Sequence, residues 1–336
     1  MRSRLAVLLL VMASVSCAHR RPPGAVNPNP PAIARFEHVF VVVEENQSYE
    51  DVIGNTTDMP YMNALATNYG VATNYYANTH PSLNNYFYLT AGRAGTRAPW
   101  VRLLADEFPG EVAGENVGSI LSANHKTWKT YAESIPRAGY IGDDRGLYVK
   151  RHNPFAYFQN VRHRPATGES SQRANIVPFD QFVIDSQTNN LPNYSFIAPN
   201  LYNDAHDDTV TKKLAPCGDH RALQQSDSWL KDNIAPVVES PEFQRGGLLV
   251  IVFDEACENG PHEDSRYDPK HRDLRGGGHV AAIVVSSLTP AGTKVDRLFH
   301  HESVLRLSLR ALGIEQMPGF ANTAADMDEF IKVKKP

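Results

Sequence analysis

The chain has 336 residues, 42% of them hydrophobic, with 33 basic and 37 acidic side chains and a formal net charge of −4. This is the composition of a globular protein, and it excludes long disorder, collagen-like repeats and a small disulfide-stapled domain. The near-neutral balance also argues against nucleic acid as a partner, because binding to phosphate backbones needs a strongly basic face.

The first residues predict export. Residues 5–15 are apolar and follow two arginines, but the run has only about half of the ~20 residues that a membrane-spanning helix needs. A basic start, a short apolar run and small residues after it are typical of a secretory signal peptide. Residues 14–17 resemble a bacterial lipobox, so we expect a signal peptide over 1–17 that ends at an acylated Cys17. Ordinary cleavage around Ser16 or Ala18 is the alternative.

Residues 18–34 are rich in proline and are expected to form an extended tether between the membrane or cleavage site and the folded part. No comparable break follows, so residues 35–336 are expected to form a single domain. The protein would be exported, either as a periplasmic or outer-surface lipoprotein or as a secreted protein. The N-terminal lipid would then be its contact with a membrane.

From residue 36 onward, apolar runs with the length of strands alternate with helical patterns. The clearest strands are expected at 38–43, 194–198, 248–253 and 280–286. Helices are expected at 61–68, 82–89, 222–234 and 302–312. This alternation predicts an α/β protein with a layered, mostly parallel sheet. Ligands bind beyond the carboxyl ends of the strands in such sheets, so the polar residues after the strands are the first candidates for function.

Two of these strands run into acidic residues. Glu44, Glu45 and Asn46 follow the first strand, and Asp254 and Glu255 follow the third. Carboxylate and amide oxygens presented by neighbouring strand ends can converge on one cation. The alternative is that each acidic group only caps the next helix or turn.

A polar loop with two hydroxyls, those of Thr79 and Ser82, precedes the helix expected at 82–89, with Pro81 at its start. A hydroxyl there would lie at a helix N-terminus, where backbone N–H groups favour an anion such as phosphate. An ordinary helix cap is the alternative. Pro81 places Ser82 inside the first turn, where its hydroxyl is expected to bond the backbone or face away. Thr79, in the approach to the helix, is therefore the better candidate nucleophile.

Further polar candidates follow the other strands. The loop 200–208 contains Asn200, Asp204 and His206, a mixture that suits metal or phosphate contacts, although a polar surface loop is equally compatible with it. His279 follows three glycines and begins a strand, a place where backbone can approach a ligand closely. His301 opens the last helix, where an exposed or capping role is the alternative.

Apart from Cys17, the chain has one pair of cysteines, Cys217 and Cys257. In an oxidising compartment they can form a disulfide, and two buried free thiols are the alternative. They follow the segments 200–208 and 254–255, which must converge if both line one site. No zinc-finger spacing is present, so a structural zinc site is not expected.

Three common enzyme motifs can be dismissed. The G-x-G-x-x-A match at 276–281 runs into an expected strand instead of a helix, so it does not indicate dinucleotide binding. The sequence contains neither a G-x-S-x-G elbow nor an H-E-x-x-H motif. It also has no Gly-Lys pair, which excludes a Walker A loop.

Five segments, in order along the chain, resemble the motifs of the bacterial phospholipase C and acid phosphatase family, within the alkaline-phosphatase-like superfamily. They are Glu45-Asn46-Gln47-Ser48-Tyr49-Glu50, Thr79-His80-Pro81 with Asn85, Pro199-Asn200 with Asp204 to Asp207, Asp254-Glu255 followed by Gly277-Gly278-His279-Val280, and His301-Glu302-Ser303-Val304-Leu305-Arg306. The resemblance spans residues 38–314, nearly the whole mature chain.

The resemblance implies a three-layer α/β/α sandwich of the alkaline phosphatase type and a metal-dependent phosphoester hydrolase. Carried over by position, it implies metal ligands at Glu45, Asn46, Asp254 and Glu255, catalytic groups at Thr79, His206 and His279, and substrate contacts from Asn85, Asn200, Asp204 and His301. A cation would activate the threonine hydroxyl and stabilise charge on the phosphoryl oxygens. The oxygen-rich ligand set admits zinc, manganese, calcium, magnesium or iron.

The sequence departs from the family pattern in three places. Glu50 stands where the family usually has Asp, no arginine follows the Thr79 motif, and the gap from Asp254 to His279 is longer than in the phospholipases. These departures favour an acid-phosphatase-like phosphomonoesterase that acts on a small phosphorylated substrate through a phosphothreonine. Phospholipase C, acting on phospholipids, is the runner-up. A non-catalytic surface lipoprotein that binds phosphorylated ligands is a further alternative.

Overall fold

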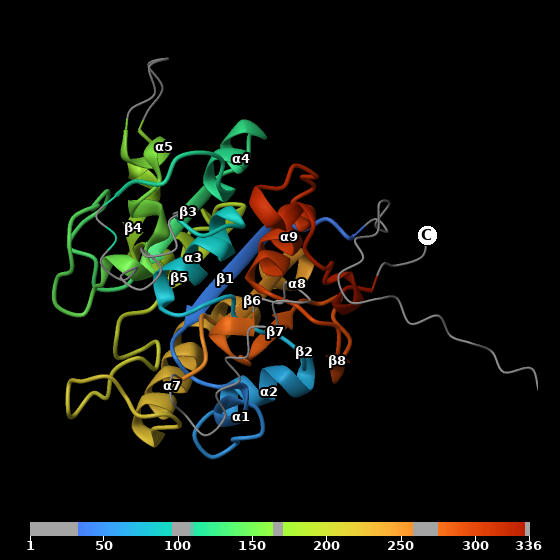
Figure 1. Ribbon diagram of the computed structural model, residues 1–336. Helices are drawn as coiled ribbons and strands as arrows, with labels where there is room; N and C mark the ends of the chain where they lie inside the picture. Colours follow the sequence, from blue (N-terminus) through green and yellow to red (C-terminus); the bar gives the residue numbers. More distant parts are fainter. Residues whose placement is uncertain (1–32, 96–107, 109, 164–170, 258–274, 333–336) are drawn as a thin grey trace, which may run out of the picture.

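The structure, a computed structural model, describes residues 33–95, 108, 110–163, 171–257 and 275–332 (Figure 1). The expected signal peptide and nearly all of the expected tether lie outside the described residues. In the part of the chain that is described, none of the helices is long and apolar enough to cross a membrane.

A central sheet organises the fold, and within the described residues it has eight strands in the order β4-β3-β5-β1-β6-β7-β2-β8. They are β1 (His38–Glu44), β2 (Gly70–Ala72), β3 (Trp128–Ala132), β4 (Ile176–Pro178), β5 (Tyr194–Ala198), β6 (Gly247–Phe253), β7 (Ala282–Val285) and β8 (Thr293–Val295). The five strands from β4 to β6 are parallel. β7 is antiparallel to both of its neighbours, and β8 is parallel to β2. The predicted mostly parallel α/β sheet is confirmed.

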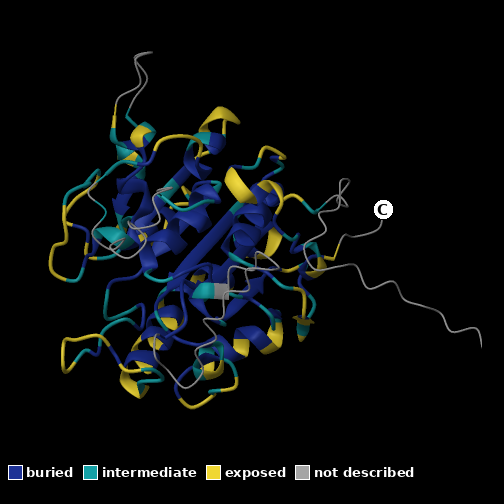
Figure 2. Ribbon diagram, in the orientation of Figure 1, coloured by how far each residue is buried: buried dark blue, intermediate teal, exposed yellow. Residues whose placement is uncertain are grey.

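Helices cover the sheet on both faces. They are α1 (Tyr49–Val52), α2 (Pro60–Asn68), α3 (Ser82–Ala91), α4 (Val117–Ala123), α5 (Gln159–Arg162), α6 (Asp180–Gln187), α7 (His220–Val238), α8 (Pro241–Gly246) and α9 (His301–Ala311). The four predicted helices correspond to α2, α3, α7 and α9. β1 runs through the middle of the molecule, and the central strands are buried (Figure 2).

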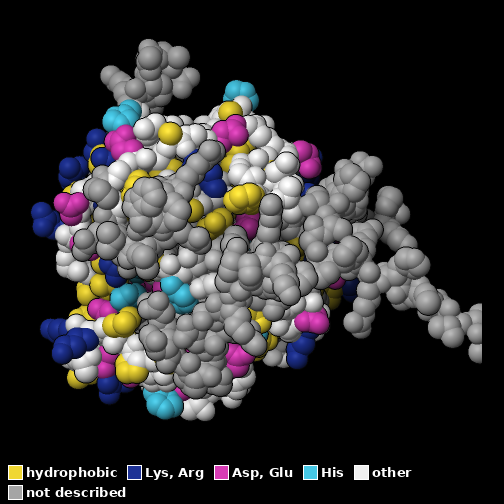
Figure 3. All heavy atoms as spheres, in the orientation of Figure 1, with side chains coloured by type: hydrophobic (Ala, Val, Ile, Leu, Met, Phe, Trp, Pro, Cys, Tyr) yellow, Lys and Arg dark blue, Asp and Glu magenta, His cyan; other side chains and the backbone are white. Residues whose placement is uncertain are grey.

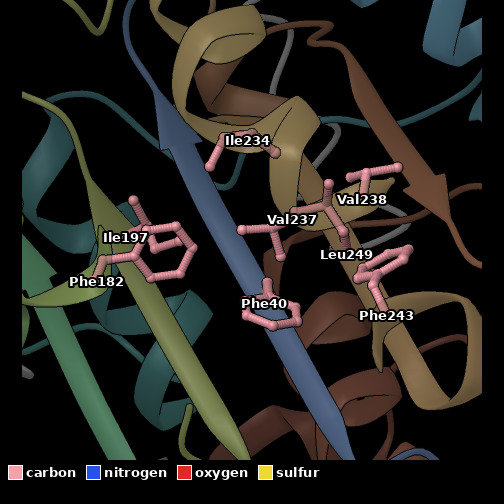
Figure 4. A pocket seen from close by; sticks show the side chains of 8 residues that line it. All are labelled: Phe40, Phe182, Ile197, Ile234, Val237, Val238, Phe243 and Leu249. Atoms are coloured by element: carbon pink, nitrogen blue, oxygen red, sulfur yellow. The ribbon is translucent and has the colours of Figure 1, made fainter. Parts of the chain in front are cut away.

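Alternation along the strands assigns each helix to a face. Phe40, Ile197 and Leu249, on three adjacent strands, meet apolar side chains of α6, α7 and α8 (Figure 4). Phe196, one residue away from Ile197, points the other way, and its ring lies 6.0 Å from that of Tyr86 on α3. Successive side chains of a strand leave on opposite faces, so α6 to α8 form one outer layer and α3 belongs to the other.

Candidate active site at the carboxyl ends of the central strands

The end of β1 sends two glutamates in opposite directions. Glu44 accepts a hydrogen bond from the Ser226 hydroxyl of α7 at 2.6 Å. Glu45, the next residue, accepts hydrogen bonds from α3, namely from the hydroxyls of Ser82 at 3.0 Å and Tyr86 at 2.5 Å. Because Ser82 and Tyr86 are four residues apart, they lie on the same face of α3. Alternation along the chain turns Glu45 away from α7, and the spacing of Ser82 and Tyr86 puts both hydroxyls on the face of α3 that meets it. Glu45 therefore lies at the N-terminus of α3.

The four residues expected to bind a metal converge here. The Asn46 backbone N–H lies 3.3 Å from Asp254 Oδ1. The side-chain amide of Asn46 lies 3.3 Å from Glu45 Oε2 and 3.2 Å from Glu255 Oε1. With its nitrogen at that position the amide donates to both carboxylates; with its oxygen there, three oxygens face one another as they would around a cation.

The carboxylates are poorly solvated. Burial raises the pKa of Glu45 well above its usual range, and the nearby carboxylates of Asp254 and Asp204 raise it further. Burial likewise raises the pKa of Asp254, followed by the charge of Glu255. Negative charges packed together out of water favour the protonated forms, or a bound cation that neutralises them.

The chemistry of these residues fits a divalent cation. Asp254 Oδ2 is buried and has no hydrogen-bond partner among the described residues. Buried carboxylate oxygens are normally paired, so an unpaired one on a carboxylate of an acidic cluster is the feature expected of a metal ligand. Glu45, Asn46, Asp254 and Glu255 could therefore hold a hard or borderline metal ion.

Ser82, and not Thr79, reaches into this cluster. The Ser82 hydroxyl lies 3.0 Å from Glu45 Oε2 and 3.5 Å from Glu255 Oε1. The expectation that it bonds the backbone or faces away is wrong, because α3 begins at Ser82 and packs this first turn against the end of β1. The Thr79 hydroxyl instead donates to the carbonyl of His80 at 2.9 Å.

Asn85 holds the loop that carries these hydroxyls. Its amide donates to the Thr79 carbonyl at 2.7 Å and to Glu255 Oε2 at 3.1 Å, and its oxygen accepts the Thr79 N–H at 3.1 Å. His80 Nδ1 lies 3.2 Å from the same Glu255 oxygen. Asn85 was expected to contact substrate, but these bonds engage both ends of its amide with the protein. It ties the Thr79 loop to the acidic cluster.

A buried histidine that the sequence did not single out completes this centre. His152 Nε2 lies 3.3 Å from Glu45 Oε1 and its Nδ1 lies 3.2 Å from Asp204 Oδ2. Its ring stacks on Tyr86 at 5.3 Å, and burial holds the pKa of His152 well below its usual range. A neutral imidazole is the form that binds metal. His152 lies in the 3₁₀ turn Lys150–His152, where no spacing pattern marks it.

His206 lies beside His152, with ring centroids 5.8 Å apart. Ligand atoms of Glu45, His152 and His206 lie within 4.8 Å of one another, so these three residues form a second possible set of metal ligands. His206 Nδ1 lies 2.6 Å from the Asp207 carboxylate. Asp204, expected to contact substrate, is buried beside His152. Histidine side chains also reach the surface near the middle of the face seen in Figure 3.

His279 follows a glycine-rich segment that packs against the Thr79 loop. A Cβ atom on Gly277 would lie 2.5 Å from the Thr79 carbonyl oxygen and 2.8 Å from its nitrogen, so only glycine lets this segment lie against the Thr79 loop. The close approach inferred from the three glycines is therefore to the protein's own loop. His279 itself contacts Glu50, with Nδ1 3.0 Å from Oε1.

Two expected substrate contacts lie elsewhere. His301 is buried behind Asp254: its Nε2 donates to the Asp254 carbonyl at 2.6 Å and its Nδ1 lies 3.0 Å from the Tyr75 hydroxyl. Burial lowers the pKa of His301 to about 3, so it is a neutral support for the strand end. Asn200 bonds Ser134 and the turn that follows it, with its oxygen 3.0 Å from the Tyr202 N–H. Neither side chain points into the acidic cluster.

The structure decides between the two states left open for the cysteines, a disulfide and a pair of free thiols. Cys217 and Cys257 are bonded, with Cα atoms 5.5 Å apart. The bond joins the segment after Asp254 and Glu255 to the loop that precedes α7. The neighbouring Gly218 donates its N–H to Gln47 at 2.8 Å, which links this bridge to the residues that follow Glu45.

Comparisons with known proteins agree with this geometry. Residues 55–314 match the Phosphoesterase family. The chain is 30% identical to a probable acid phosphatase of Kluyveromyces lactis, over 81% of this chain and 57% of that protein. It is 32% identical to a phosphatidylinositol-3-phosphatase of Mycobacterium tuberculosis, over 67% of this chain and 65% of that protein. The chain thus spans less than two thirds of the length of these curated relatives.

Solved structures support the fold. A protein of the alkaline phosphatase superfamily from Vibrio parahaemolyticus aligns with a TM-score of 0.56 at 11% identity, over 90% of this chain and 73% of that one. The lipoteichoic acid synthase LtaP of Listeria monocytogenes aligns with a TM-score of 0.57 at 10% identity, over 91% of this chain and 79% of that one. At such identities the likeness extends to the fold alone, and it confirms the expected alkaline-phosphatase-like architecture.

Proposed function

Since the chain belongs to the Phosphoesterase family, we propose that it is an exported, metal-dependent phosphomonoesterase. The observation that carries the proposal is a hydroxyl at a helix N-terminus that contacts buried carboxylates: Ser82 lies beside Glu45 and Glu255, which cluster with Asn46 and the buried Asp254. The curated relatives are named as phosphatases, which supports a hydrolase that acts on phosphoester bonds.

The site suits a transferring phosphoryl group. The first N–H groups of α3 have no acceptor within their own helix, and they and the helix dipole favour an anion ahead of Ser82. A cation held by the acidic cluster would neutralise charge on the phosphoryl oxygens and lower the pKa of the attacking hydroxyl. Metal and helix N-terminus thus address the two barriers to phosphoester hydrolysis, charge repulsion and a weak nucleophile.

Two hydroxyls compete for the role of nucleophile. Sequence position favours Thr79, and hence a phosphothreonine intermediate. The contacts favour Ser82, because its hydroxyl already donates to a carboxylate that could accept its proton. In either case the oxygen forms a bond to phosphorus, the ester oxygen leaves, and water then releases phosphate and restores the hydroxyl. We propose Ser82 as the attacking group.

The test is hydrolysis of p-nitrophenyl phosphate by the full chain after chelation and metal addition. The Ser82→Ala variant should lose about 10³-fold or more in kcat, while Thr79→Ala should remain within about tenfold of the unsubstituted protein. Acid-quenched protein should carry the phosphoryl label on Ser82. Label on Thr79 with near-normal turnover by Ser82→Ala would restore the phosphothreonine mechanism, and an inactive but metal-loaded protein would contradict the proposed function.

A matched control comes from another helix N-terminus. Ser240 caps α8, and its hydroxyl accepts the Phe243 N–H at 3.2 Å. The Ser240→Ala variant should lose about 1 kcal/mol of stability and keep its activity. If Ser240→Ala lost as much activity as Ser82→Ala, the effect of Ser82→Ala would reflect the loss of a helix cap and not of the nucleophile.

The substrate class divides the alternatives. The relative named as a phosphatidylinositol-3-phosphatase supports removal of a terminal phosphate, on a lipid headgroup or a small molecule. Turnover of phosphatidylcholine in preference to p-nitrophenyl phosphate would instead identify a phospholipase C. Export rests on the sequence of residues 1–17, and the mass of the mature N-terminal peptide would distinguish an acylated Cys17 from simple cleavage.

A further inference from the structure

We propose that Glu50 is a positioning residue that holds His279 as the proton donor to the leaving oxygen, an inference that rests on the proposed function. Glu50 is the residue of the first motif that departs from the family's usual aspartate. Its carboxylate Oε1 lies 3.0 Å from His279 Nδ1, across 229 positions of sequence. The side chain of His279 is 14% exposed and that of Glu50 is 43% exposed, so solvent reaches the pair from the Glu50 side.

Two tyrosine rings clamp the imidazole. Tyr49 stacks on His279 with ring centroids 4.3 Å apart and an angle of 15° between the planes. Tyr76 stacks on it at 5.0 Å and 25°. The backbone fixes the same arrangement, because the Tyr49 N–H donates to the His279 carbonyl at 2.9 Å and Tyr76 pairs with His279 in an isolated antiparallel bridge. These contacts fix the orientation of the His279 ring. What can still change is which of its two nitrogens carries a proton.

The contact with Glu50 determines which nitrogen can exchange a proton. A carboxylate accepts, so Nδ1 carries a hydrogen directed at Glu50. His279 Nε2 is buried and has no hydrogen-bond partner among the described residues. A buried imidazole nitrogen is normally paired, so an unpaired one on a clamped ring is in place for a group that only a substrate brings.

The segment before His279 is hydrogen-bonded to both parts of the candidate site. The Gly277 carbonyl accepts the Ala256 N–H at 2.8 Å, and Ala256 directly follows Glu255. The Ala77 N–H donates to the Gly278 carbonyl at 3.0 Å, two residues before Thr79. The segment before His279 is thus fastened both to the strand end that carries the acidic cluster and to the loop that carries the hydroxyls.

This arrangement suits proton donation to the departing alcohol. As the bond between phosphorus and the ester oxygen breaks, the imidazolium Nε2–H would pass its proton to that oxygen, which leaves as the neutral alcohol. The ring becomes neutral and keeps its Nδ1–H on Glu50. When water attacks the phosphoenzyme, Nε2 takes a proton from it, and the cycle closes without any other reactant.

Leaving-group dependence tests this role. Nitrophenolate leaves without a proton at neutral pH, whereas an alkoxide does not, so proton donation matters for ethyl phosphate and little for p-nitrophenyl phosphate. The kcat/KM values for the two esters report the step that breaks the ester bond. The His279→Ala variant should lose about 10²–10⁴-fold on ethyl phosphate and far less on p-nitrophenyl phosphate. The Glu50→Gln variant should show the same selectivity with a loss of about tenfold, and Glu50→Asp should recover most of it.

The matched control is a histidine–glutamate pair remote from the site. His163 Nε2 lies 2.8 Å from Glu111 Oε2, and Glu111→Gln should change neither value. Equal losses on the two esters in Glu50→Gln, or in His279→Ala should the former fail to fold, would overturn the inference while leaving the proposed function intact. An unsubstituted protein that hydrolyses neither ester would contradict the proposed function and this inference with it.

Discussion

The disulfide between Cys217 and Cys257 is expected to stabilise the fold by an amount that can be calculated from the length of the loop it closes. The bonded residues are 40 positions apart. In the loop-entropy model, closing a loop of that length removes about 13 cal/mol/K from the unfolded chain, or about 4 kcal/mol at 25 °C. Replacing both residues, as Cys217→Ser with Cys257→Ser, should lower the free energy of unfolding by about that amount.

The measurement is urea unfolding of the oxidised protein, the reduced protein and the double variant, each without metal. If chain entropy dominates, the reduced protein and the double variant should unfold at similar urea concentrations, both well below the oxidised protein. Activity should fall as well, because Cys257 follows Glu255 by two residues and the bridge fastens that strand end to the loop before α7. A loss of less than about 1 kcal/mol in the double variant would refute the reasoning.

Two further predictions concern the carboxylates. Burial raises the pKa of Glu44 from 4.5 to about 8. The folded protein therefore keeps this carboxyl protonated, and its free energy of unfolding falls as the pH rises from about 4.5 towards 8, because the unfolded chain ionises first. Metal-free Glu44→Gln should therefore be more stable than the unsubstituted protein by up to about 3 kcal/mol at pH 7 and nearly equal to it at pH 4.5; urea unfolding curves with the same pH slope would contradict this. Asp254→Asn should lower bound metal, measured by elemental analysis, together with activity, while the fold remains. Unchanged metal content would exclude Asp254 as a ligand, and a purely capping role would cost only about 1 kcal/mol of stability.

The central strands could be read from sequence because they are buried on both faces. The runs that became β1, β5 and β6 are almost continuously apolar, which is how strands of a covered parallel sheet look. The three-residue strands β2, β4 and β8 were missed, since so short a segment has no period to detect, and β3 (WKTYA) was missed because its lysine and threonine interrupt the apolar run. The reversed direction of β7 was also missed, because strand direction depends on the path of the connections and not on strand composition.

The sequence predicted the site residues that directly follow strands, but not those that only tertiary packing brings to the site. Glu45 and Asp254 come directly after adjacent parallel strands, so their convergence follows from the architecture. His152 could not be found in this way, because only the contact between its short turn and α3 brings it to Glu45. Ser82 was misjudged for the same reason: local rules for a serine in a first helical turn ignore the carboxylate placed opposite it.

Two consecutive glutamates at the end of β1, Glu44 and Glu45, lie in different environments. Glu44 faces α7, where a single serine hydroxyl meets it and burial favours its protonated form. Glu45 faces α3, where two hydroxyls, a histidine and further carboxylates surround it. A slip of one residue in the register of β1 would exchange the two faces and place Glu44 in the cluster. The pairing of β1 with β5 and β6, which fixes that register along the whole strand, therefore also determines which carboxylate is available to bind a cation.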